Sequence, residues 1–327
     1  MSVTSMDQKE KIHSIQSKTA VEKQYRERVM NDLSNASSIQ SHCYSCKPIP
    51  SQVLYVLVPL FFTGLAVSIF ILIAVHNAFL FVSLLCLSAL VAAFLIWNTV
   101  NWRRSRALFC YLRSFPDSDL RLARHGQLVK ITGLVSCGNI SLESSYEKAT
   151  RCIYTSTLLY EYPGLGLKLA DAKVPCFGWG LAYCERFSTD FYITDSKSGI
   201  RALVKAGSGS RVTPLIVESR LVNTTRKCRF LSSHFKKWLA ERNISGQARL
   251  LRLEEGYVKE GSSMAVIGML HRDNDALMIV QPPELLSTGC LWRKLLLPVD
   301  IDGVILGVPE MVGPVANPPS SMQQWEH

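Results

Sequence analysis

The sequence is short of charge and of cysteine. Charged residues make up only 19% of the 327 residues, and positions 53–100 contain no Asp, Glu, Lys or Arg at all. Ten cysteines over this length are too few for a small disulfide-rich scaffold. The 48% share of hydrophobic residues excludes a chain that is disordered throughout. The charges are unequal, with 36 Lys and Arg against 26 Asp and Glu, so the formal net charge is +10.

The uncharged block predicts two transmembrane helices. A helix rises about 1.5 Å per residue, so crossing a hydrocarbon core of about 30 Å takes roughly 20 residues. Residues 53–75 and 78–100 each meet this length, and the polar pair His76 and Asn77 separates them. We therefore expect a membrane hairpin over residues 51–102. The alternative, a buried helix pair in a soluble core, fits less well because such helices rarely stay uncharged for so long.

Basic residues beside the second span predict its orientation. Arg103, Arg104, Arg106 and Arg113 follow the span, whereas the turn between the two spans carries no Lys or Arg. The positive-inside rule then places both termini in the cytosol. The same arginines are candidate contacts for anionic membrane lipid, at about 1 kcal/mol for each residue near the surface. Cys110 lies in this zone and is a candidate for palmitoylation.

Four glycosylation patterns favour the opposite orientation. They begin at Asn35, Asn139, Asn223 and Asn243, and they would be used only if the large domain were lumenal. Such short patterns arise easily by chance, so the charge rule takes precedence.

We expect an integral membrane protein of the plasma membrane or of the Golgi and endomembranes rather than of an organelle envelope. Gly64 and Ala66 in the first span are small residues that offer a helix contact, so a homo-oligomer remains an alternative.

The rest of the chain predicts a mainly antiparallel β domain, residues 119–308, behind a basic juxtamembrane linker, residues 103–118. In residues 128–136 apolar side chains alternate with Lys130 and Thr132, which we expect on the polar face. Further strands are expected over residues 151–162, 188–194, 199–205, 215–218, 264–270, 276–281 and 292–299. The turn at residues 195–199 would join two of these strands in a hairpin.

One amphipathic helix interrupts the strands. Phe235, Trp238 and Leu239 fall on one face of it, and Ser232 or Ser233 can cap its start. We expect this aromatic face to pack in the domain core rather than to serve as a docking surface.

Two strands share a glycine pattern that predicts a barrel. Gly126 and Gly133 bracket one alternating strand, and Gly261 and Gly268 bracket another with the same spacing. A glycine inside a strand usually marks a bulge or a sharp bend. Two strands that bend at the same point favour a small closed barrel of the OB-like kind. The expected fold class is membrane-anchored α+β: a two-helix transmembrane hairpin, then a small antiparallel β barrel with one amphipathic helix.

Both ends of the chain are expected to be extensions. Residues 1–50 are polar and rich in Ser and Gln, which favours disorder. Cys43 and Cys46 form a lone CxxC in this segment, and a zinc site would need a second ligand pair. Residues 309–327 carry four prolines and predict an exposed Pro-rich tail.

Five segments of the β domain together resemble the GIDE domain, also called the "beside a membrane" domain. They are residues 128–135, 152–161, 191–203, 260–268 and 277–283. In the proteins that carry it, this domain lies between the transmembrane helices of RING-type ubiquitin ligases of mitochondria and chloroplasts. The whole layout is more similar to a group of plant membrane proteins, some of which carry a label related to ubiquitin-specific peptidases.

The chain departs from ligases and peptidases at the residues that would carry chemistry. A RING holds two zinc ions with eight closely spaced Cys and His ligands, but after residue 283 only Cys290 and His327 remain. A peptidase needs a nucleophilic cysteine with a His and an orienting polar residue, but Cys152 falls inside an expected strand. We therefore expect no catalytic residue, no metal and no cofactor.

The stretch between Cys176 and Cys184 is the most distinctive candidate site. It includes Trp179 and Tyr183 among glycines, and both aromatic types are enriched at the energetic centres of protein interfaces. We interpret it as a candidate interaction loop, with a loop packed between strands as the alternative. The acidic pairs at residues 117 and 119, 254 and 255, and 300 and 302 are interpreted as solvated turns.

Two classes of function remain. The first is a non-catalytic, membrane-tethered adaptor or scaffold whose β domain binds a protein partner or anionic lipid. The alternative is a component of a ubiquitin-pathway enzyme, either a degenerate peptidase or a ligase-recruiting subunit. No nucleic-acid partner is expected, because the basic residues lie beside the predicted spans, where a lipid surface is the nearer ligand.

Overall fold

A computed structural model describes eight stretches of the chain. They are residues 29–34, 51–75, 78–162, 179–224, 231–244, 250–273, 276–288 and 299–308. The chain divides into two compact units, one of residues Ser37–Leu112 and Ser287–Asp300, the other of Met1–Ala36, Arg113–Leu286 and Ile301–His327. The expected Pro-rich tail and most of the expected disordered N-terminal segment, with its CxxC, lie outside the described residues.

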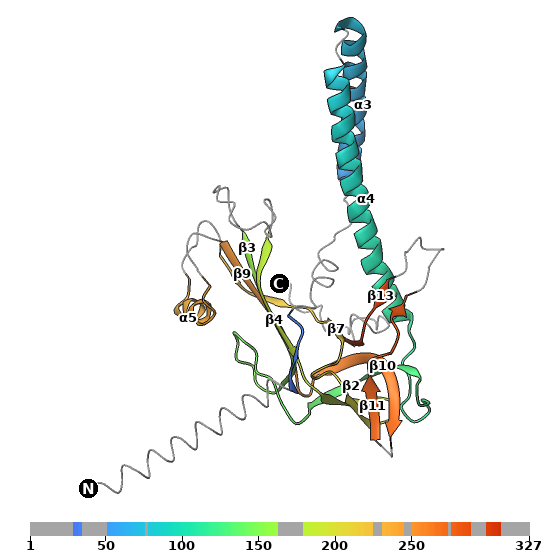
Figure 1. The fold of residues 1–327 in the computed structure, drawn as a ribbon, viewed down its shortest axis with the longest axis vertical. Coiled ribbons are helices and arrows are strands. Elements are labelled where there is room, and N and C mark those ends of the chain that lie inside the picture. The colour runs from blue at the N-terminus through green and yellow to red at the C-terminus, as the bar shows by residue number, and fades with distance from the viewer. Residues whose placement is uncertain are drawn as a thin grey trace, which may run out of the picture. The chain divides into compact units, whose positions relative to one another are not determined.

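Two long apolar helices make up most of the first unit (Figure 1). Helix α3 spans Ser51–Val75 and α4 spans Phe79–Ser114. Both are long and apolar enough to cross a membrane. The prediction of two apolar helices is confirmed, and the pair expected to separate them lies outside the described residues. Helix α4 continues beyond residue 100, so the arginine-rich segment expected as a linker is helical up to Ser114.

Small residues allow these helices to pack closely, and hydroxyl groups are satisfied inside the helices, as an apolar environment requires. Gly64 faces Leu84 of α4, since a Cβ at Gly64 would lie 3.5 Å from Leu84 Cδ1. The hydroxyl of Thr63 donates to the carbonyl of Pro59 at 3.0 Å, which satisfies it inside the helix. Large apolar side chains remain exposed along both helices, among them Tyr55, Phe62, Phe70, Phe79, Leu90 and Phe94. Gly64 thus contributes to packing within the hairpin itself.

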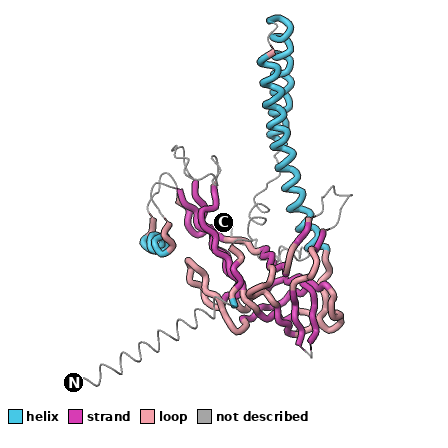
Figure 2. Tube along the Cα trace, in the orientation of Figure 1, coloured by secondary structure: helices cyan, strands magenta, loops and turns pink. Residues whose placement is uncertain are grey.

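Strands and loops predominate in the second unit (Figure 2), which contains a closed five-stranded barrel. The barrel strands are β2 (Leu128–Cys137), β5 (Phe191–Asp195), β6 (Arg201–Val204), β10 (Ser263–Asp273) and β11 (Ala276–Val280). The order around the barrel is β2, β5, β6, β11, β10 and back to β2. Every pair is antiparallel except β6 with β11, which is parallel. The expected closed barrel and the hairpin turn between β5 and β6 are confirmed.

Glycines allow the barrel strands to approach closely. A Cβ at Gly133 of β2 would overlap the carbonyl oxygen of Thr194 in β5. A Cβ at Gly268 of β10 would lie 2.6 Å from a methyl carbon of Ile279 in β11. The second glycine of each patterned strand therefore lies at a seam of the barrel. Beyond β10, β14 (Val304–Gly307) and β7 (Val212–Leu215) extend the sheet.

A second sheet belongs to the same unit. Its strands, in spatial order, are β1 (Asn31–Asp32), β4 (Gly180–Ser188), β3 (Cys152–Tyr162), β9 (Leu250–Lys259) and β8 (Ser219–Asn223), and all neighbours are antiparallel. Residues of β3 and β9, such as Tyr154 and Val258, share the main hydrophobic core with barrel residues. A two-stranded pair, β12 (Leu286–Ser287) with β13 (Asp300–Ile301), completes the described strands.

Helix α5 (Ser233–Glu241) covers one face of this second sheet. Its buried residues Phe235, Trp238 and Leu239 pack with leucines of β3 and β9. The backbone N–H of Phe235 donates to the hydroxyl of Ser232 at 3.1 Å, so Ser232 is the N-cap. The predicted helix, its cap and its core-facing aromatic side are confirmed.

Three expectations for this unit were wrong. Lys130, expected on a polar face, is fully buried, with its Nζ 3.2 Å from the carbonyl of Phe115 and 3.5 Å from a carboxylate oxygen of Asp117. Glu254 and Glu255 lie in the middle of β9 rather than in a solvated turn. Residues 216–218, expected as strand, form the connection between β7 and β8. Most of the strand expected over 292–299 lies outside the described residues.

Candidate functional site: the two faces of the second sheet

The stretch expected to form an interaction loop is mostly a strand. Cys176 lies outside the described residues, Trp179 directly precedes β4, and Tyr183 and Cys184 lie within β4. The loop expectation is therefore corrected, because β4 pairs with β3 over most of its length. A register shift between Leu159 and Tyr160 interrupts the regular alternation of side chains, so Tyr183 and Trp179 lie on opposite faces of the sheet.

Tyr183 lies on the face that α5 covers. Its ring contacts Trp238 edge-on, with ring centres 5.9 Å apart, and its hydroxyl donates to Glu185 at 3.2 Å. Burial, together with the Glu185 carboxylate, raises the pKa of Tyr183, so the phenol stays protonated and remains a donor. Arg242, which follows α5, places its guanidinium 4.3 Å from the centre of the Trp238 ring and 3.4 Å from Glu185.

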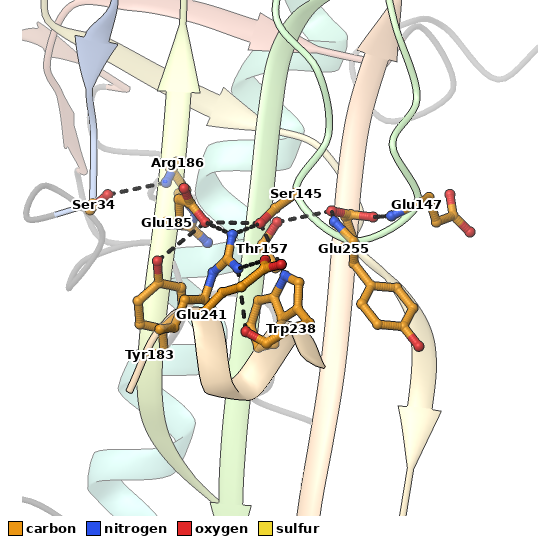
Figure 3. Close-up of polar contacts among 12 residues, drawn as sticks. Ser34, Ser145, Glu147, Thr157, Tyr183, Glu185, Arg186, Trp238, Glu241 and Glu255 are labelled. Carbon is orange, nitrogen blue, oxygen red and sulfur yellow. Dashed lines mark hydrogen bonds and ion pairs between the residues drawn. The ribbon is translucent and has the colours of Figure 1, made fainter. Parts of the chain in front are cut away.

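Ser145 connects these side chains into one cluster (Figure 3). Its hydroxyl donates to Glu185 at 3.0 Å and accepts from the indole N–H of Trp238 at 3.2 Å and from Arg242 at 2.5 Å. A serine beside a carboxylate is one element of an activated nucleophile. Here, however, the serine oxygen already accepts from two donors. Through these hydrogen bonds the cluster holds the end of α5 and the loop that carries Ser145 against the sheet.

Glu255 is a buried carboxylate on the same face, with 1% of its surface exposed. It accepts from the backbone N–H groups of Tyr146 at 2.8 Å and Glu147 at 2.9 Å, and from the hydroxyl of Thr157 at 3.0 Å. Three donors compensate a buried carboxylate for the loss of water. Glu255 therefore holds the loop before β3 against the middle of the sheet.

The opposite face carries an arginine between two aromatic rings. Leu251 and Leu253 pack in the cluster with α5, so Arg252 between them points the other way. Its guanidinium carbon lies 4.7 Å from the ring centre of Tyr160 and 4.9 Å from that of Trp179. Stacking of this kind stabilises a guanidinium and holds its orientation.

Neighbouring residues extend this arrangement, which we name the aromatic–arginine face. It consists of Tyr160, Tyr162, Trp179, Leu181, Arg220, Arg252 and Glu254. The rings of Tyr162 and Trp179 have centres 5.8 Å apart. A carboxylate oxygen of Glu254 lies 3.1 Å from Nε of Arg252 and 3.4 Å from Nε of Arg220. Leu181, opposite Tyr160 in β4, is 41% exposed. The face thus combines half-buried aromatic rings, an exposed leucine and fixed charges.

The candidate lipid contacts lie along α4. Arg104, Arg106 and Arg113 are exposed, and Arg103 is half-buried. The guanidinium of Arg106 lies 4.8 Å from the ring centre of Trp102, an aromatic type common at membrane interfaces. The palmitoylation candidate Cys110 also belongs to α4.

Nucleophile and metal chemistry have little support among the described residues. Cys152 is fully buried at the start of β3, and this burial raises the pKa of its thiol to about 11. The reactive thiolate is therefore disfavoured at neutral pH. Within the described stretches, no group of three or more His, Cys, Asp or Glu side chains could hold a metal ion. His125 and His271, with ring centres 4.6 Å apart, form a pair only.

Comparison with known proteins gives one strong match. The chain is 45% identical over 264 residues to a protein of Arabidopsis thaliana named "Uncharacterized membrane protein At1g16860". The match covers 80% of this chain and 55% of the relative, so the chain spans about half the length of the curated relative it matches. No family model matches the chain, and no solved structure matches it. The match and the two apolar helices agree with a membrane protein, and the resemblance to the GIDE domain stays a prediction.

Proposed function

We propose that the chain is a non-catalytic, membrane-tethered adaptor whose β domain binds a protein partner through the aromatic–arginine face. Trp, Tyr and Arg are the residues most enriched at the energetic centres of protein interfaces. The observation that carries the proposal is the stacking of Arg252 between Tyr160 and Trp179, because this stacking fixes all three types in one place before a partner arrives. Such preorganisation lowers the entropy cost of binding.

The position of this face on the sheet supports the same proposal. Among the described strands, β8 has a neighbour on one side only, and its residues are half-buried or exposed. Arg220 of β8 and Arg252 of β9 share the carboxylate of Glu254, which links the face to that edge. A partner could therefore contact the aromatic rings and the edge strand together.

The hairpin supplies the tether in this proposal. The basic residues of α4 favour a cytosolic, anionic leaflet, so the β domain and both termini would lie on the cytosolic side. The name of the Arabidopsis relative describes it as a membrane protein, which supports an integral membrane location for this chain. We propose the plasma membrane or the Golgi and endomembranes as the compartment, with Arg103, Arg104, Arg106 and Arg113 as a second, lipid-binding site. Because these arginines lie beside the proposed spans, we propose that they bind a lipid surface rather than a nucleic acid.

We also propose that the barrel is OB-like. If the barrel strands are numbered one to five along the chain, their order around the barrel is 1-2-3-5-4, with strands 3 and 5 parallel. A five-stranded Greek-key barrel of this kind is the OB architecture. The second sheet is then an elaboration: β3 and β4 follow the first barrel strand, β8 and β9 follow the third, and β1 precedes the barrel. In the ligases that the sequence resembles, the GIDE domain is the non-catalytic part, which agrees with an adaptor.

A ubiquitin-pathway component is the second candidate, and it rests on that resemblance. In the form of a degenerate peptidase it would need an accessible thiolate, which the burial of Cys152 disfavours. In the form of a ligase-recruiting subunit it would use the same aromatic–arginine face, and the identity of the partner would distinguish it.

Site-specific photocrosslinking tests the proposal. A photoreactive amino acid at Leu181 of the full chain, in native membranes, should give a discrete protein adduct that Trp179→Ala and Arg252→Ala each remove. The same probe at Leu134, which is 55% exposed on barrel strand β2, is the positional control. Arg211→Ala, an exposed arginine outside this face, is the variant control. No adduct at Leu181, or identical adducts at both probe positions, would overturn the proposal, and lipid adducts alone would favour a lipid-facing surface.

A further inference from the structure

Residues 29–34 precede the hairpin in sequence, yet they belong to the unit that follows it. Their strand β1 pairs with β4, with Asn31 opposite Ser188 and Asp32 opposite Phe187. The backbone N–H of Leu33 donates to the carbonyl of Arg186 at 2.9 Å. The chain therefore leaves this domain, forms the two apolar helices and returns to the same domain.

Three side chains of the segment fit specific positions, and two of them, Asn31 and Leu33, alternate along the strand. Leu33 is 5% exposed and belongs to the main hydrophobic core. The side-chain amide of Asn31 donates to the carbonyl of Ser210 at 2.5 Å. The hydroxyl of Ser34 accepts from the backbone N–H of Arg186 at 3.1 Å (Figure 3). Asp32, between them, is exposed.

The loop at residues 206–210 forms the other side of the site. Besides Ser210, the carbonyl of Ala206 accepts from the Asn31 amide at 3.4 Å, and the backbone N–H of Ser208 donates to the carbonyl of Val29 at 3.0 Å. A Cβ at Gly207 would lie 3.0 Å from the same Val29 carbonyl. Glycine at this position therefore leaves space for the segment.

We propose that the edge of β4, together with loop 206–210, is a strand-addition binding site whose ligand is the chain's own segment 29–34. In this mode of recognition, main-chain hydrogen bonds supply affinity and pockets for alternate side chains supply specificity. Both are present here, and the fitting ligand is an extended peptide with the pattern Asn-x-Leu-Ser. The site is separate from the aromatic–arginine face, so the inference does not rest on the proposed adaptor function.

The connection to the hairpin explains why so short a contact holds. Residues 35–50 join the segment to α3, so the ligand is tethered to its site and its effective concentration is about millimolar. When the segment docks in cis, the chain before α3 and the chain after α4 both belong to one domain. This attachment requires both segments to lie on the same side of a membrane.

Disulfide trapping tests the site and the origin of its ligand. Asp32 and Phe187 form a non-hydrogen-bonded antiparallel pair, because the adjoining pair, Leu33 and Arg186, carries the ladder bond. Such pairs have Cα atoms about 4.5 Å apart, within reach of a disulfide. Asp32→Cys with Phe187→Cys, introduced into the full chain in membranes and oxidised, should give a disulfide inside one chain. Asp32→Cys with Leu181→Cys, which uses the far end of β4, should give none.

Two outcomes overturn the proposal, and a second variant tests the pocket. A disulfide found only between two chains would show that the segment is exchanged between copies instead of docking in cis. The absence of any disulfide would show that the segment does not bind this edge of β4. Leu33→Asp in the same double-cysteine chain should lower the yield by about tenfold, because it places a charge in the core. Ser38→Asp, a change in the neighbouring linker, should leave the yield unchanged. An unchanged yield with Leu33→Asp would show that the pocket does not recognise the segment.

Discussion

The guanidinium of Arg186 lies 3.1 Å from the carboxylate of Glu218, and the Arg186 side chain is only 5% exposed. The hydroxyl of Ser156 joins the pair, since it donates to Glu218 at 2.9 Å and accepts from Nε of Arg186 at 3.4 Å. The three residues connect β4, β3 and the segment before β8. A buried charge that loses its partner is strongly destabilising, because neither water nor another charge compensates it.

Glu218→Ala should therefore lower the free energy of unfolding by about 3–5 kcal/mol. Arg211 and Asp302 offer a matched control at 3.0 Å, with side chains 70% and 47% exposed. Asp302→Ala should cost less than about 1 kcal/mol, because water screens the exposed pair. Urea unfolding of the full chain in detergent, followed by tryptophan fluorescence, measures both values. Equal losses would contradict the assignment of a buried pair.

Cys152 should show the high pKa of its thiol in both reactivity and stability. Burial raises this pKa to about 11, whereas the thiol of an unfolded chain has a pKa of about 8.5. At pH 8 the folded chain should react with iodoacetamide at Cys152 at least about tenfold more slowly than the urea-unfolded chain. Mass spectrometry of the peptide that contains Cys152 gives the rate, and fast labelling of the folded chain would contradict the prediction.

The same pKa difference sets a direction for stability. Between about pH 9 and 11 the folded thiol of Cys152 keeps a proton that the unfolded thiol loses. Its contribution is therefore complete below the unfolded pKa and is lost as the pH rises through the folded one. Cys152→Ala should lose less stability than the parent chain over this interval, as measured by urea unfolding at each pH. An identical pH dependence of the two chains would count against the raised pKa.

Glu255 should control the order of the loop before β3. Glu255→Ala leaves two backbone N–H groups and the Thr157 hydroxyl without their carboxylate acceptor, at a cost on the order of 3 kcal/mol. Hydrogen–deuterium exchange at the amides of Tyr146 and Glu147 should accelerate, while exchange in β2 stays as it was. Glu143→Ala, at an exposed position of the same loop, is the control. Unchanged exchange at the two amides would show that other contacts hold the loop.

Local sequence patterns predicted the elements whose residues repeat regularly. The uncharged block predicted both apolar helices, period-two alternation predicted β2 and β10, and helical spacing predicted α5 with its Ser232 cap. Strand β4 could not be recognised in this way, because it begins with glycine and buries Arg186. That burial depends on Glu218, which lies 32 positions away in the sequence.

The candidate site was predicted by residue type but not by geometry. The residue types of Trp179 and Tyr183 predict aromatic interface residues, yet the register shift in the pairing of β3 with β4 places them on opposite faces. Arg252 and Ser145 were missed, because they meet the aromatic residues only through the pairing of β3 with β9 and the docking of α5. An arginine between two leucines in β9 is the one local signal that was available.

Gly133 should be among the least replaceable residues of the barrel. A side chain on this residue of β2 would overlap the carbonyl oxygen of Thr194, and backbone atoms in a hydrogen-bonded ladder have little room to move. Gly133→Ala should cost on the order of 1–3 kcal/mol through forced separation of β2 and β5. Ser136→Ala, three residues further along β2 in a half-buried position, is the control and should change the free energy of unfolding by less than about 1 kcal/mol. If both variants unfold at the parent's urea midpoint, the strands do not approach as closely as the barrel requires.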